Sequence, residues 1–295
     1  MSVNTSSDTL VAEATRKPFG EFLRRFARQK AAIVALVFLL LLIGSAIFAP
    51  LFMTLDPNSA DYNAILQGSS AAHWAGTDEY GRDIFTRIIY GGRISLAVGF
   101  LSVTLGGLIG VFLGILAGFY GGFLDSLIMR ISDVLFAFPG ILLAIAVIAI
   151  LGPGIDNVIY AVAVFSVPVF ARLSRGTTLS MKKAVYIDAA RAIGVSDHMI
   201  VLRHLLPGTL PNVIVYFSMR IGTSILTAAS LSFIGLGAQP PSSEWGAMLA
   251  AGRSYMGVAD HLTLYPGIAI FVTVLAFNVF GDGLRDALDP KIDVN

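Results

Sequence analysis

The chain has 295 residues, of which 56% are hydrophobic and 13% are charged, and its formal net charge is +1. Soluble domains carry about 25% charged residues, so this composition indicates an integral membrane protein rather than a soluble enzyme. The sequence contains no cysteine, which excludes disulfide bonds, thiol chemistry and cysteine-based metal sites.

The first 30 residues are expected to form a cytoplasmic tail that ends in a basic segment. Phe19, Phe22 and Phe26 fall on one face of this segment, among several lysines and arginines. The pattern predicts an amphipathic helix. It would lie either on anionic lipid or against a neighbouring subunit.

Six apolar runs follow, each about as long as the ~20 residues that cross a bilayer. The sequence therefore predicts an all-α membrane protein with six transmembrane helices. Residues 31–93 would form the first span and an external loop, 94–283 a core with the other five spans, and 284–295 a cytoplasmic tail. We expect Pro139 and Pro168 to kink the third and fourth spans, and Asp125 and Arg130 to lie in the turn before the third. The runs are 31–52, 94–120, 131–151, 158–173, 213–236 and 262–280.

Four glycines recur at four-residue steps in the second predicted span, at Gly106, Gly110, Gly114 and Gly118. Small residues at this spacing let another helix approach closely. We expect tight packing within the subunit here, with a subunit interface as the alternative.

Basic residues are concentrated before the first span and between positions 172 and 203, and are sparse in the loops 56–93 and 237–261. Loops rich in Lys and Arg remain on the cytoplasmic side. This distribution predicts that both termini and the loop around residue 190 are cytoplasmic. The chain is expected to cross its membrane several times, and the family resemblance given at the end of this section implies that this is the bacterial inner membrane.

The cytoplasmic loop 184–207 is a polar segment between two apolar spans. Its composition predicts a short helix over 184–193 that ends at Gly194, because glycine is favoured just past a helix C-terminus. Ser196 is placed to begin a second helix, which Pro207 is expected to end. Such a hairpin could be moved as a unit by a partner outside the membrane.

The chain carries no recognisable catalytic or metal-binding pattern. It has no G-x-x-x-x-G-K-[ST] sequence for binding ATP, and its histidines, at positions 73, 198, 204 and 261, lie in three separate regions. Among the acidic residues, Asp133 alone lies within an apolar run, beside Arg130. Ion-coupled carriers need ionisable groups near the bilayer midplane, so a secondary carrier and an intramembrane enzyme are both disfavoured. We expect no catalytic residue and no metal site, and an energy source that lies in a partner.

Arg220 lies about two turns into the fifth predicted span. A buried arginine in a span costs at least ~2.5 kcal/mol and needs a partner or water. Its side chain either reaches back to the cytoplasmic headgroups or faces a transport pathway, with Tyr216 and Ser224 on the same helix face.

The loop and several other segments resemble a known family. Asp188-Ala189-Ala190, Gly194 and Leu206-Pro207 resemble the EAA loop of ABC-importer permeases, with Asp188 where that loop usually has Glu. The segments 76–83, 90–96, 231–241, 244–246 and 275–290 resemble the C-type subunits of peptide/nickel importers. The runs 133–151 and 219–224 are most similar to the glutathione importers within that group.

This resemblance implies the ABC-importer permease fold and its partners. They are a B-type permease that completes a heterodimer, two cytoplasmic ATPases that use ATP and Mg²⁺, and an external solute-binding protein; besides membrane lipid and the substrate, no nucleic acid is expected. The chain itself would bind no cofactor. Its substrates would be di- and oligopeptides, with glutathione as one candidate, and a nickel or metal-chelate importer is the alternative. Pro240, Pro241 and Trp245 would contact the binding protein or form a structural plug in the outer loop.

Overall fold

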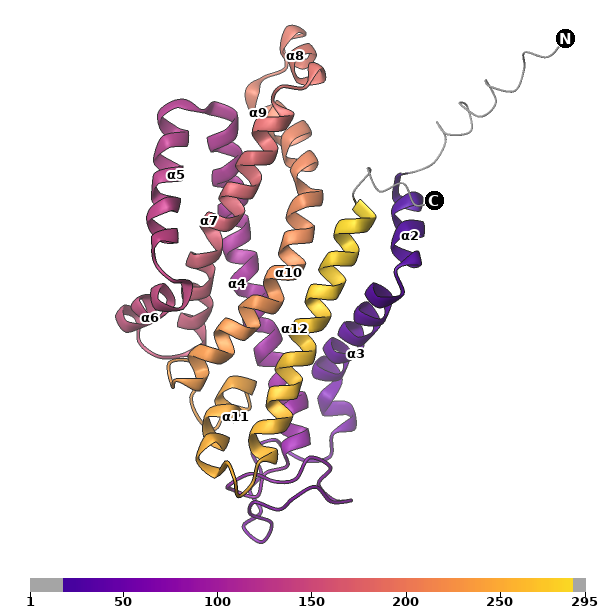
Figure 1. The fold of residues 1–295 in the computed structure, drawn as a ribbon, viewed down its shortest axis with the longest axis vertical. Coiled ribbons are helices and arrows are strands. Elements are labelled where there is room, and N and C mark those ends of the chain that lie inside the picture. Colours follow the sequence, from indigo (N-terminus) through magenta and orange to yellow (C-terminus); the bar gives the residue numbers. More distant parts are fainter. Residues whose placement is uncertain (1–17, 289–295) are drawn as a thin grey trace, which may run out of the picture.

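The computed structural model describes residues 18–288, and the tail 1–17 and residues 289–295 lie outside the described part. The described chain is a bundle of long helices (Figure 1), and its only extended pairing is an isolated bridge between Thr77 and Asp83. The elements are α2 (Pro18–Arg28), α3 (Lys30–Phe52), α4 (Ile84–Tyr120), α5 (Gly122–Ala137), α6 (Gly140–Leu151), α7 (Ile155–Met181), α8 (Val185–Ala192), α9 (Asp197–Ile200), a π-helical turn (Val201–Leu205), α10 (Leu206–Phe233), α11 (Trp245–Gly252), a 3₁₀ turn (Arg253–Tyr255) and α12 (His261–Leu288).

Five helices in this part of the chain are long and apolar enough to cross a membrane, counting α9 through α10 as one. The predicted third span is instead two helices, α5 and α6, which meet at an angle of 96°. The expected kink at Pro139 is therefore a sharp break, and the chain has six spans if the bent pair counts as one. The all-helical fold class is confirmed, and a continuous third span is wrong.

Helices α4 and α7 form the centre of the bundle, and the glycines of α4 set their distance. A Cβ on Gly110 would lie 2.4 Å from the carbonyl oxygen of Val167, and one on Gly114 would lie 2.2 Å from that of Ala171. No side chain fits in these gaps, so the glycine face packs within the subunit, as the sequence predicts. The subunit-interface alternative is not needed to explain it.

Helix boundaries differ from the predicted spans where polar residues are helical. Helix α4 begins at Ile84 rather than at 94, because the Asp83 carboxylate caps it by accepting a hydrogen bond from the Thr86 backbone N–H at 2.8 Å. Asp125 and Arg130 lie inside α5 rather than in a turn, since only Gly121 separates α4 from α5. Helix α12 continues to Leu288, so the first five residues of the expected C-terminal tail are helical.

The basic segment is helix α2, and it packs against its own chain. Phe26 is buried, with its ring 6.0 Å from that of Phe280 on α12 and 6.1 Å from that of Phe22. The amphipathic helix is confirmed. Its aromatic face packs on α12 of the same chain.

The two ends of the bundle differ in character. Helix α8, α2 and the last turn of α12 lie at one end, shown at the top of Figure 1, whereas the segment 53–83 and α11 lie at the other. This arrangement agrees with the predicted topology, in which the loop around residue 190 shares a side with both terminal helices. Below, these are called the loop end and the outer end.

Candidate functional site

The loop end projects a short helix that is closed by glycine. Gly194 follows α8 with φ of +85°, a conformation that side chains with a Cβ disfavour. Its N–H donates to the Arg191 carbonyl at 2.9 Å, and the Val195 N–H donates to the Ala190 carbonyl at 3.0 Å. This pair of bonds is the Schellman pattern that ends helices, so the predicted stop at Gly194 is confirmed.

Helix α8 has an inner and an outer face. Ile187 and Ala190 are buried and join the main hydrophobic core with Ile200 and Leu205. Asp188 and Ala189 point outward, and Asp188 makes a loose ion pair with Arg191 at 3.7 Å. Val185 and Ile193 are 83% and 81% exposed. The outer face is thus an apolar surface around one carboxylate, while the inner face fixes the helix to the bundle.

The predicted second helix does not end at Pro207. Helix α9 passes through the π-helical turn into α10, where Pro207 sits in the first turn. Proline is tolerated there because the π-turn already replaces the regular bonds, with the Leu206 N–H donating to the Val201 carbonyl. The loop is therefore one short helix on the end of a span, rather than a free hairpin, and Leu206 and Pro207 belong to that span.

Ionic and polar contacts tie the loop to neighbouring helices. The Lys182 ammonium donates to the Phe119 carbonyl at the end of α4. The Arg191 guanidinium lies over the Phe119 ring at 5.5 Å. Below them, Arg175 on α7 grips the Asp125 carboxylate on α5 through two bonds of 2.5 and 2.7 Å. A force on α8 would reach α4, α7 and α10 together.

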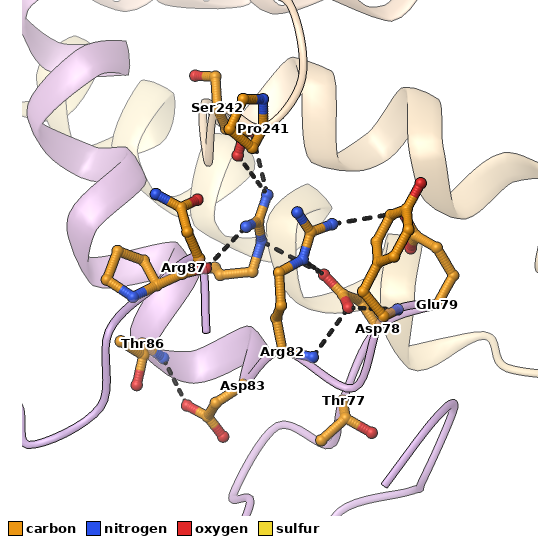
Figure 2. Close-up of polar contacts among 12 residues, drawn as sticks. Thr77, Asp78, Glu79, Arg82, Asp83, Thr86, Arg87, Pro241 and Ser242 are labelled. Carbon is orange, nitrogen blue, oxygen red and sulfur yellow. Dashed lines mark hydrogen bonds and ion pairs between the residues drawn. The ribbon is translucent and has the colours of Figure 1, made fainter. Parts of the chain in front are cut away.

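A buried ionic cluster closes the outer end (Figure 2). Arg87, only 4% exposed, donates to the carbonyls of Pro57 at 2.8 Å, Pro241 at 3.3 Å and Ser242 at 3.1 Å. The Asp78 carboxylate lies 2.7 Å from Arg82 and 3.5 Å from Arg87. The cluster joins the segment after α3, the start of α4 and the loop before α11.

The sequence assigned no role to the charged residues of this cluster. The motif 76–83 and the segment 244–246 drew attention only through their resemblance to other permeases. Glu244 is buried and caps α11 by accepting from the Ala247 N–H at 2.8 Å. Its other oxygen accepts a hydrogen bond from Ser95 at 3.3 Å. The sequence did contain a signal for this cluster, because acidic residues and arginines are concentrated beside glycines in the segment 76–83, just before a span.

Trp245 is a structural plug rather than a contact surface. Its side chain is 0% exposed, and its indole N–H donates to the Ile88 carbonyl at 2.9 Å. It therefore cannot touch a binding protein directly. Pro240 and Pro241 are exposed at the surface, joined by a cis peptide bond, and remain candidates for that contact.

Arg220 lies near the middle of α10 and does not reach back to the loop end. Its guanidinium stacks over the Phe165 ring of α7 at 4.8 Å and donates to Thr223 at 3.3 Å, one turn toward the outer end. Snorkelling toward the loop end is therefore wrong. Ser224, which the sequence placed beside Arg220, is buried, and the guanidinium bonds to Thr223 instead.

Asp133, which lies near Arg130 in the sequence, forms its ion pair with a different helix. Asp133 pairs with Arg172 of α7 at 2.7 Å, and the Arg172 guanidinium lies over the Phe136 ring at 4.4 Å.

No group of three or more His, Asp or Glu residues able to hold a metal occurs within residues 18–288.

A helical bundle with a short helix projecting at one end and a buried ionic cluster at the other agrees with the permease class of membrane transport subunits. Comparison with known proteins agrees. A profile of the family "Binding-protein-dependent transport system inner membrane component" matches residues 110–294, and a profile of the N-terminal membrane domain of oligopeptide transport permease C matches residues 17–68. The chain belongs to this family of ABC-importer permeases.

Its relatives are similar over nearly their whole length. The chain is 58% identical to the glutathione transport system permease protein GsiD of Pectobacterium atrosepticum and 59% identical to that of Escherichia coli O6:K15:H31, covering 95% of this chain and 93% of each relative. Among solved structures, an inward-facing MetNI methionine ABC transporter matches with a TM-score of 0.57 and 22% identity over 70% of this chain and 98% of that one. An amino acid ABC transporter matches with a TM-score of 0.52 and 17% identity, over 67% of this chain and 92% of that one. These two structures support the fold alone.

Proposed function

We propose that the chain forms, together with a second permease, the pathway of an ATP-driven importer for short peptides, with glutathione as a substrate. The observation that carries the coupling part is the outer face of α8. Its exposed apolar residues surround Asp188, and its inner face is fixed to helices that cross the bundle. Such a surface suits a cleft on a cytoplasmic ATPase.

The substrate assignment is supported by the relatives. They are named for glutathione transport, and they align with 95% of this chain. A nickel or metal-chelate importer is the alternative that the sequence left open. Uptake of labelled glutathione and of radioactive nickel by cells that carry the complete transporter distinguishes them. Nickel uptake without glutathione uptake would overturn the peptide assignment.

The remaining partners are proposed from membership of the permease family. They are a B-type permease, two cytoplasmic ATPases that use ATP and Mg²⁺, and an external binding protein that meets the outer end near Pro240 and Pro241. The chain would bind no cofactor itself. In this arrangement the loop end and both termini face the cytoplasm of a bacterium, and the chain spans the inner membrane.

Co-purification tests the coupling surface directly. Ile193→Ser should reduce recovery of the ATPase with the permease at least several-fold, because an exposed apolar anchor is lost from α8. Phe123→Ser is the matched control, since Phe123 is equally exposed at the same end, at the start of α5. Equal recovery for the Ile193 variant and wild type would contradict docking through α8.

A further inference from the structure

A stripe of polar side chains runs along α10 through the membrane-crossing part of the bundle. The stripe consists of Asn212, Tyr216, Arg220, Thr223, Thr227 and Ser230. Steps of three and four residues place these side chains on one face of a helix. All six are exposed or half-buried, while Ser218 and Ser232 on the other side of α10 are buried. An apolar span that turns its polar residues outward needs water or a polar partner on that face.

The hydroxyl groups on the stripe have unused acceptor capacity. Thr227 donates its proton to the Thr223 carbonyl at 2.8 Å, and Ser230 donates to the Leu226 carbonyl at 2.8 Å. A hydroxyl has one proton and two lone pairs, so these oxygens still accept hydrogen bonds. They present acceptors suited to the N–H groups of a peptide.

Arg220 is the cation of the stripe, and its charge is unpaired within residues 18–288. It makes no ion pair with a carboxylate there, its Nε is buried without a hydrogen-bond partner, and one bond to Thr223 uses one of its five N–H donors. The Phe165 ring beneath it lies ten residues into α7, or about 15 Å from that helix's outer end at 1.5 Å per residue. Arg220 itself lies about midway along α10, in a segment long and apolar enough to cross a membrane.

The break between α5 and α6 lies beside this arginine. A Cβ on Gly140, the first residue of α6, would lie 2.5 Å from the Phe165 ring that supports the guanidinium. Phe165 thus lies between the start of α6 and the guanidinium. Ser230 and Asn278 are the two polar residues in the lining of an otherwise apolar, open groove of about 630 Å³ between α6, α10, α11 and α12.

We propose that the polar stripe of α10 is this subunit's wall of the transport pathway, and that Arg220 is its binding position for the carboxylate of a passing peptide. The inference rests on the proposed function and adds the substrate class. The preferred substrates are anionic peptides, which carry one more carboxylate than ammonium groups. An interface with the second permease is the competing use of this face. It would leave an unpaired charge buried unless the partner supplied an acid, at a cost of several kcal/mol.

Cysteine labelling tests the wall in chains that keep Arg220. Thr223→Cys, Thr227→Cys and Ser230→Cys should react with a small charged thiol reagent in membrane vesicles that hold the assembled transporter, and added peptide should slow the reaction. Leu41→Cys is the control, because Leu41 is 68% exposed on α3 and lies outside the stripe. Labelling of the three positions no faster than Leu41→Cys would overturn the pathway assignment.

Transport by Arg220 variants tests the carboxylate role. The substrate pairs are Ala-Glu-Ala with Ala-Gln-Ala, and glutathione with its glycine amide, so each pair differs by one carboxylate. We expect Arg220→Gln to lower uptake of the more anionic member about tenfold relative to the other, and Arg220→Lys to restore much of the difference. Equal loss for both members, or no loss, would overturn the role of Arg220. Absence of all peptide uptake in the wild-type complex would instead refute the proposed function.

Discussion

At the residue scale, the glycines of α4 make the most local demand on the sequence. Gly114→Ala would place a methyl group 2.2 Å from the Ala171 carbonyl, so the two central helices must separate. Overpacking of this kind costs about 1–3 kcal/mol. We expect a lower midpoint of thermal unfolding for the detergent-solubilised protein. Size-exclusion chromatography of heated samples measures this midpoint.

Gly176 on α7 is the matched control, because it is also helical but has open space where a Cβ would stand. Gly176→Ala should leave stability unchanged or raise it by about 0.5–1 kcal/mol, since alanine is the better helix former. Similar losses for both variants would show that the close approach of α4 to α7 does not limit stability.

Arg87 presents the opposite case, a buried charge that organises three backbone segments. Arg87→Gln removes charged donors from the carbonyls of Pro57, Pro241 and Ser242, and a hydrogen bond to a charged group is worth about 1.5–3 kcal/mol. We expect a lower unfolding temperature and faster proteolysis of the loop before α11. Arg253→Gln is the control, since Arg253 is exposed at the same end, and it should cleave at the wild-type rate.

At the element scale, the orientation of α8 depends on one glycine. No atom lies within 4 Å of the position of a Cβ on Gly194, so a substitution that keeps the backbone N–H acts only through its φ of +85°. Gly194→Pro cannot adopt a positive φ and should abolish uptake while the permease still inserts. Gly194→Asn, which tolerates this conformation, should retain most uptake. Uptake by the proline variant close to wild type, with normal ATPase association, would contradict the coupling role of the loop.

The prolines show where sequence reasoning stops for these elements. Hydropathy predicted the long spans because length and composition alone decide whether a helix can cross a bilayer. A proline in the sequence shows only that one backbone N–H is missing, whereas the surrounding contacts decide whether the helix breaks or continues. Pro139 precedes a 96° break at which Gly140 lies close against the Phe165 ring, whereas Pro207 is accommodated by a π-helical turn. Neither contact could be predicted from local sequence.

The candidate site follows the same division. Gly194 and the exposed Asp188 were predictable because helix ends have a local signature. The burial of Trp245 and the partners of Arg87 were not, because they depend on contacts between segments more than 150 residues apart. The pairing of Asp133 with Arg172 was not predictable either, because it joins two helices whose contact local sequence does not show.

At the scale of the whole molecule, the two ends have to lie on opposite sides of the membrane for the proposed function. Ser69 is exposed in the segment between α3 and α4 at the outer end, and Ser180 is exposed in the last turn of α7 near α8. Figure 1 places these segments at opposite ends of the long helices. The distribution of lysines and arginines puts the loop end in the cytoplasm.

Single cysteines at these two positions test the topology of the assembled protein in intact cells. The natural chain has no cysteine, so each variant carries one reactive thiol and no background. Ser69→Cys should react with a membrane-impermeant maleimide, whereas Ser180→Cys should react only after the cells are permeabilised, because the inner membrane then no longer separates it from the reagent. The reverse pattern would place α8 outside the cell, beyond the reach of any cytoplasmic ATPase. Coupling through α8 would then be impossible, even though the fold and the family membership would be unchanged.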